Sequence, residues 1–125
     1  MIDITPHLED GVVEIRVEGK LEAADFENVA PIVDGMIEQK GKIKGLLLNV
    51  SEFTGWRDVD ALLTHFKFVK DHHAYIERVA AVSSKPWHEI LPRFAAVFVK
   101  AEPRHFKVEN IDHAMRWVRG GEPPA

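Results

Sequence analysis

Cysteine is missing altogether from this chain of 125 residues. Its absence excludes disulfide bonds, thiolate zinc sites and thiol nucleophiles, and a chain without disulfides suits the reducing cytosol. The sequence also lacks a G-x-G-x-x-G run, a P-loop and a G-x-S-x-G elbow, so no motif marks a nucleotide site or a serine hydrolase. We therefore predict a protein that is not an enzyme and that uses no cofactor.

Long apolar runs are absent too. The longest block, Phe94–Val99, is far shorter than the roughly 18 residues that a membrane span needs. The first eight residues include Asp3, Pro6 and His7, and this pattern predicts no secretion signal. We expect a cytoplasmic protein, for which any association with a membrane would be peripheral.

No excess of positive charge is present: 16 Lys and Arg face 20 Asp and Glu, a net charge of −4. Bulk attraction to nucleic acid is therefore not expected. The first 63 residues hold six basic and 13 acidic side chains, whereas residues 64–119 hold ten basic and six acidic ones and six of the seven histidines. Two interpretations stay open, namely two ordinary solvated faces or a face in the second half that meets anionic headgroups or ligands.

The apolar pattern along the chain predicts alternating strands and helices. Asp10-Gly11 lies between two alternating runs and predicts a hairpin, and Pro31 predicts a bend or break in the first helix. The expected elements are strands at 2–5 and 13–17, a helix at 22–39, a strand at 46–50, a loop at 51–56, a helix at 56–71, a strand at 79–82, a helix from 86, a strand at 104–108 and a helix at 111–118.

This order predicts an α/β fold with a mixed, mostly parallel five-stranded sheet, an N-terminal hairpin and about four helices. No internal repeat or linker interrupts the chain. We expect one domain over residues 1–120, followed by a disordered tail over residues 121–125.

Several runs of the chain carry a family resemblance: LLLNVSEFTGW at 46–56, DALLTHFKFVKDHHAYIERVAAVSS at 60–84, KAEPRHF at 100–106 and AMRWV at 114–118. Together they resemble the SpoIIAA-like family, bacterial proteins of the STAS superfamily that are similar in fold to CRAL-TRIO lipid-binding domains. The resemblance spans residues 1–120 and is most specific over Phe53–His73. It implies binding of hydrophobic ligands or association with membranes.

Phosphorylated anti-sigma-factor antagonists of that superfamily carry a serine just after the third strand. The resemblance places Asp58 near that position, and no Ser or Thr occurs over residues 56–63. The phosphorylation switch is therefore not carried over to this chain. Asp58 either mimics a permanently phosphorylated state or is a carboxylate that stabilises the first turn of a helix.

Ligands of open α/β sheets lie beyond the carboxyl ends of parallel strands. Two tryptophan-bearing segments meet that condition here, one after the strand at 46–50 and one after the strand at 79–82. The predicted ligand-binding residues are Phe53, Trp56, Phe68, Ser84, Lys85, Trp87 and His88. The alternative is that each tryptophan covers the core under its own loop.

Metal binding is not expected, because His65 and His72 lie seven residues apart on one predicted helix, whereas metal pairs on a helix are usually four apart. Phe68 falls outside the apolar stripe of that helix and could serve a homodimer interface, a lipid cleft or ordinary core packing. The leading hypothesis is a non-enzymatic module that binds a small hydrophobic or amphipathic, lipid-like ligand. The alternative is a regulatory module that binds a protein partner.

Overall fold

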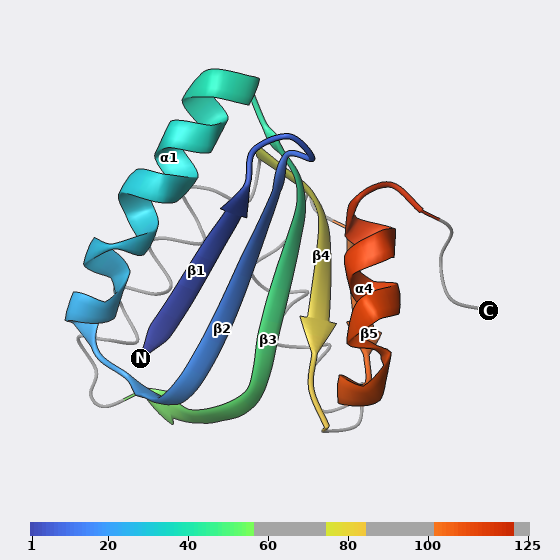
Figure 1. Ribbon diagram of the computed structural model, residues 1–125. Coiled ribbons are helices and arrows are strands. Elements are labelled where there is room, and N and C mark those ends of the chain that lie inside the picture. Colours follow the sequence, from blue (N-terminus) through green and yellow to red (C-terminus); the bar gives the residue numbers. More distant parts are fainter. Residues whose placement is uncertain (57–74, 85–101, 122–125) are drawn as a thin grey trace.

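The computed structural model describes residues 1–56, 75–84 and 102–121 (Figure 1). The helices predicted at 56–71 and from 86 lie outside these residues, apart from Trp56, which ends a strand. The described elements are β1 (Ile2–His7), β2 (Val12–Leu21), η1 (Ala23–Glu27), α1 (Val29–Lys40), β3 (Ile43–Trp56), β4 (Ile76–Val82), β5 (Glu102–Phe106), η3 (Val108–Asn110) and α4 (Ile111–Val118).

The five strands form one sheet in the order β1-β2-β3-β4-β5. β1 is antiparallel to β2, and β2, β3, β4 and β5 are mutually parallel along the sheet. This confirms the predicted mixed, mostly parallel sheet with an N-terminal hairpin. β4 begins three residues before the predicted strand, because Ile76 also pairs with Ile43 at the start of β3.

The hairpin turns at Gly11, whose φ of 69° lies in the left-handed region that glycine adopts without strain. Its carbonyl oxygen accepts a hydrogen bond of 2.8 Å from the backbone N–H of Lys44, which ties the turn to the start of β3. The first strand was predicted to stop before Pro6, but β1 continues to His7. Proline is tolerated there because β1 is an edge strand.

The predicted break in the first helix is present at Asn28, which separates the 3-10 turn η1 from α1. Pro31 is the third residue of α1, in the first turn, where a backbone N–H has no partner within the helix. α1 ends at Lys40 and is capped by Gly41, whose φ is 80° and whose N–H donates to the carbonyl oxygen of Ile37. This is the predicted glycine stop.

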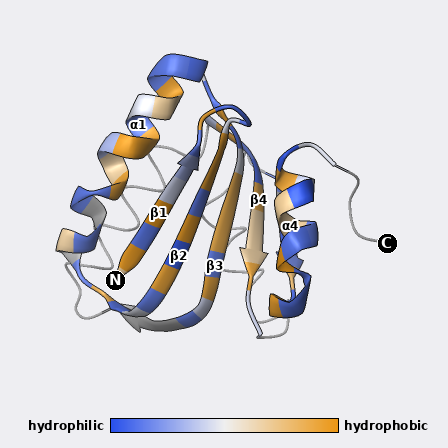
Figure 2. Ribbon diagram, viewed as in Figure 1, coloured by the Kyte–Doolittle hydropathy of each residue, from blue (hydrophilic) through white to orange (hydrophobic). Residues whose placement is uncertain are grey.

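Apolar and polar residues alternate along β2 (Figure 2). Apolar side chains of the strands are buried on both faces of the sheet. One face packs against α1 through Val29, Val33 and Met36. The other face packs against α4. The α4-side cluster consists of Val12, Leu47, Ala80, Val82, Phe106, Ala114, Trp117 and Val118.

Among the side chains that the structure describes, Trp117 is the largest fully buried one, with 1% of its surface exposed. The guanidinium carbons of Arg78 and Arg104 lie 5.0 and 5.6 Å from the centroid of its ring, within cation–π range. Arg78 Nη1 also donates to the carbonyl oxygens of Trp117 (2.7 Å) and Gly121 (3.1 Å). The Trp117 carbonyl oxygen also accepts a hydrogen bond of 3.0 Å from the backbone N–H of Gly120. A cation at this position is favourable because the carboxyl end of a helix carries partial negative charge.

Candidate functional site

The carboxyl end of the sheet is shaped by the divergence of β3 from β4. The two strands pair from Ile43↔Ile76 to Asn49↔Val82, and no later pair joins them in the described residues. β3 instead continues along β2 until Trp56 pairs with Leu21. In Figure 1 the end of β3 bends toward the end of β2, away from β4. We call this end of the sheet the carboxyl edge.

Two irregularities in the pairing of β3 with β2 produce the bend. Between Arg16↔Asn49 and Glu18↔Glu52, β3 advances three residues while β2 advances two. Between Gly19↔Phe53 and Lys20↔Gly55, β3 advances two residues while β2 advances one. Each extra residue is a β-bulge, which bends its strand and increases the local twist.

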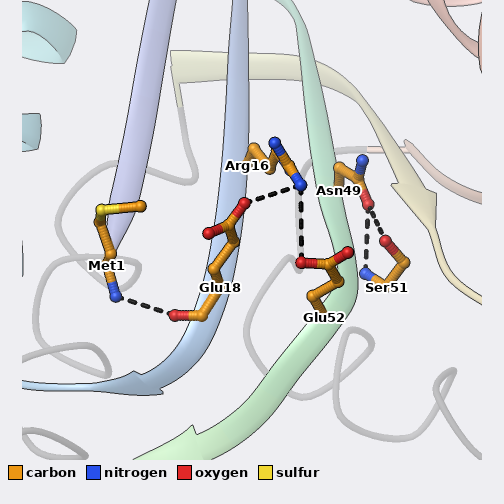
Figure 3. Close-up of polar contacts among 6 residues, drawn as sticks. All are labelled: Met1, Arg16, Glu18, Asn49, Ser51 and Glu52. Carbon is orange, nitrogen blue, oxygen red and sulfur yellow. Dashed lines mark hydrogen bonds and ion pairs between the residues drawn. The ribbon is translucent and has the colours of Figure 1, made fainter.

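The side chain of Asn49 stabilises the first bulge (Figure 3). Its Oδ1 accepts a hydrogen bond of 3.1 Å from the backbone N–H of Ser51 and one of 2.7 Å from the Ser51 hydroxyl. A side-chain oxygen therefore takes the place of a cross-strand carbonyl for the backbone N–H of Ser51. Asn49 is also the last residue of β3 that pairs with β4. The same residue therefore lies at the end of that pairing and stabilises the bulge.

A charged cluster crosses β2 and β3 beside this bulge (Figure 3). Glu18 and Glu52 are register partners on the two strands, and like charges in that position destabilise a sheet. Arg16 Nη2 lies 2.7 Å from Glu18 Oε1 and 3.5 Å from Glu52 Oε2, so one cation faces both carboxylates. The Arg16 and Glu52 side chains are about half exposed or more, so water screens these pairs strongly.

Ser83, Ser84 and His105 occupy the β4 and β5 side of the carboxyl edge. Ser83 is buried, and its backbone N–H donates to the carbonyl oxygen of Phe106 at 3.2 Å. Its own carbonyl oxygen lies 3.0 Å from His105 Nε2, a contact in which the imidazole nitrogen is the donor. Ser84 is exposed.

The predicted ligand-binding residues are only partly within the described structure. Phe53 and Trp56 lie on β3, in register with Gly19 and Leu21 of β2, and Ser84 follows β4. β3 and β4 are parallel neighbours, the arrangement on which the predicted site depended. The bend nevertheless carries Trp56 along β2, away from the end of β4. Phe68, Lys85, Trp87, His88 and the regulatory candidate Asp58 lie outside the described residues.

Residues 51–56 were predicted to form a loop and instead complete β3. Sequence reasoning also missed the Arg16 cluster and the Asn49–Ser51 pair. The alternation of Arg16 and Glu18 on one face of β2 was visible in the sequence, but the partner Glu52 becomes evident only once the register is known.

The described polar groups of the carboxyl edge largely satisfy one another. The Ser51 hydroxyl is bonded to Asn49, and Arg16 faces two carboxylates. Across residues 1–56, 75–84 and 102–121, no three His, Asp or Glu side chains are grouped so as to hold a metal ion. Within the same ranges no helix is long and apolar enough to cross a membrane.

Comparison with known proteins agrees with this architecture. An uncharacterised protein with a SpoIIAA-like fold from Shewanella loihica PV-4 is 24% identical, with a TM-score of 0.71 over 94% of this chain and 92% of that one. The unphosphorylated anti-sigma factor antagonist SpoIIAA is 16% identical, with a TM-score of 0.63 over 97% of this chain and 100% of that one. The chain matches no curated protein. The sequence model of the SpoIIAA-like family matches residues 12–119, and the chain belongs to that family.

Proposed function

We propose that this chain is a non-enzymatic module that binds a small hydrophobic or amphipathic, lipid-like ligand at the carboxyl edge, with peripheral membrane association as the setting. The observation that supports it is the parallel pairing of β3 with β4 and their divergence after Asn49↔Val82. Both segments that the sequence singles out, 53–56 and 83–88, begin at this edge. The carboxyl ends of parallel strands are the usual position of a ligand in open α/β folds.

The pairing of the described polar groups bears on the chemistry of this ligand. Arg16 faces Glu18 and Glu52, and Ser51 is bonded to Asn49, so these side chains would have to give up existing contacts to bind a polar group. Replacing existing hydrogen bonds with new ones gains little free energy. Affinity would then come mainly from apolar contact, which is consistent with the aromatic residues Phe53 and Trp56 at the end of β3.

Tryptophan fluorescence provides the test, with oleate and with phosphatidylglycerol vesicles as separate probes. The expected result is a saturable shift in emission for wild type that is reduced by at least half in Trp56→Phe or Trp87→Phe. Trp117 is 1% exposed and lies on α4, so its emission serves as an internal reference. A response to oleate alone would indicate a free ligand, and one to vesicles alone a membrane surface.

Phosphatidylcholine vesicles are the control for charge, because they have the same acyl chains without the net negative headgroup. An unchanged emission of wild type with oleate and with both kinds of vesicle would contradict the proposed ligand class. An emission shift of unreduced size in both Trp56→Phe and Trp87→Phe would refute this site, although the ligand would still bind.

A second candidate function is a regulatory module that binds a protein partner. It is favoured by the alignment with the anti-sigma factor antagonist SpoIIAA, which covers 97% of this chain and the whole of that one. In this proposal the partner contacts the surface around Asp58. The carboxylate of Asp58 supplies a fixed negative charge in a segment, residues 56–63, that contains no Ser or Thr to be phosphorylated.

Affinity capture from the native host distinguishes this candidate. Asp58→Arg is expected to lose at least 90% of a partner that wild type recovers, because two units of charge change at the contact surface. Glu38→Arg makes the same change in charge at an exposed position of α1 and should recover the partner as wild type does. Equal recovery by wild type and both variants would refute the role of Asp58.

A further inference from the structure

The outer strands on the two sides of the sheet share a feature that neither proposed function uses. Among the described strands β1 and β5 are the outermost, and each holds a proline, Pro6 in β1 and Pro103 in β5. An edge strand presents backbone N–H and C=O groups that can pair with a strand of another chain. Because proline has no backbone N–H, its effect depends on whether its position faces the sheet or the free edge.

Pro6 lies at a position of β1 that faces away from β2. The terminal amine of Met1 donates to the carbonyl oxygen of Glu18 at 2.8 Å, and Glu18 N–H donates to the carbonyl oxygen of Met1 at 2.9 Å. Met1 and Glu18 are thus a hydrogen-bonded antiparallel pair, and such pairs recur at every second residue. Thr5 therefore directs its backbone groups to β2, whereas Pro6 directs its own away from the sheet.

Pro103 lies at the equivalent kind of position on β5. The backbone N–H of Ser83 donates to the carbonyl oxygen of Phe106, so Phe106 directs its backbone groups to β4. In a parallel strand the residues that face one neighbour also alternate. Arg104 consequently faces β4, while Pro103 and His105 face the opposite side. Each edge of the sheet therefore lacks one outward donor, in a strand of only six or five residues.

We propose that Pro6 and Pro103 protect the two sheet edges from pairing with the edge strand of a second copy of this chain. A proline at an inward position would cost the sheet a hydrogen bond of its own, whereas at these two positions it removes only a donor that a foreign strand would use. The inference is independent of the ligand at the carboxyl edge. It further implies that a homodimer or a protein partner does not bind by adding a strand to this sheet.

Sedimentation analysis of Pro6→Val, Pro103→Val and the double variant tests the proposal. Each substitution supplies an outward N–H and a residue that favours strands. The double variant is expected to self-associate at least tenfold more tightly than wild type, which corresponds to about 1.4 kcal/mol. Hydrogen exchange should show protection of the backbone amide at position 6 or 103 in the associated form, because that amide has gained a partner.

Two control variants distinguish the effect of the added outward backbone N–H from the effects of adding valine to β1 or of removing a proline. Thr5→Val introduces the same side chain on β1 at a position whose N–H already faces β2, and Pro31→Val removes an exposed proline from α1. Neither control should associate more tightly than wild type. Association of Thr5→Val equal to that of Pro6→Val would overturn the proposal, as would unchanged association of the double variant. If a valine variant fails to fold, as judged by circular dichroism, the alanine variant at the same position supplies the same donor and decides the question.

Discussion

Trp117→Ala is expected to lower the free energy of unfolding by about 3–5 kcal/mol, the range for removing a large aromatic side chain from a core. Trp117 is almost fully buried, and its ring lies 5.8 Å from that of Phe106. It also provides the surface on which Arg78 and Arg104 lie. Alanine would leave a large cavity under α4 and deprive two guanidinium groups of their aromatic contact.

Urea denaturation followed by far-ultraviolet circular dichroism measures this effect. Trp117→Phe is the matched control, because it keeps an aromatic ring and much of the apolar contact, and its loss should be clearly smaller than that of Trp117→Ala. A loss below about 1 kcal/mol for Trp117→Ala would contradict the packing described for α4, since core truncations of this size cost several times more.

Trp117 also illustrates what the sequence could reveal and what it could not. The closing helix was predicted from Ile111, Ala114, Met115 and Val118, and α4 has those limits. Trp117 is three residues after Ala114 and thus on the same helical face. Its burial could therefore have been predicted from the spacing alone. The predicted ligand site instead rested on Trp56 and Trp87, because both follow apolar strands.

For the strands, too, some features were predictable from the sequence and others were not. The apolar runs at 46–50 and 79–82 predicted two buried strands, and both belong to the interior of the sheet. β3 continues to Trp56, although Ser51 and Gly55 are residue types that favour turns. Its extension depends on two bulges and on pairing with β2. These are properties of the partner strand, which local sequence patterns do not contain.

The sequence predicted at which end of the sheet the candidate residues lie, but not which residues contact one another there. Parallel alternation placed the ends of β3 and β4 at one end of the sheet, and the structure has them there. The bend that takes Trp56 along β2, and the ion pairs of Arg16 with Glu18 and Glu52, arise from the register. A one-residue bulge reverses which side chains share a face, so the arrangement beyond Asn49 could not be inferred from alternation.

Gly45→Ala is expected to destabilise the protein by about 2–3 kcal/mol, because it would overpack the contact between β3 and α4. A Cβ atom on Gly45 would lie 2.3 Å from the carbonyl oxygen of Val118 and 2.5 Å from its Cβ. The first obstacle is backbone, which cannot rotate away as a side chain can. α4 would have to move off the sheet, and Trp117, the neighbour of Val118, would lose part of its packing.

Gly35→Ala is the matched control, since a Cβ atom there meets nothing within 4 Å and the residue lies inside α1. Alanine in a helix is favoured over glycine by roughly 0.5–1 kcal/mol, so this variant should be slightly more stable than wild type. The same chemical change is thus expected to have opposite signs at the two positions, measured by the midpoint of urea denaturation. Equal midpoints for the two variants would mean that α4 does not approach β3 as closely as the contact at Gly45 requires.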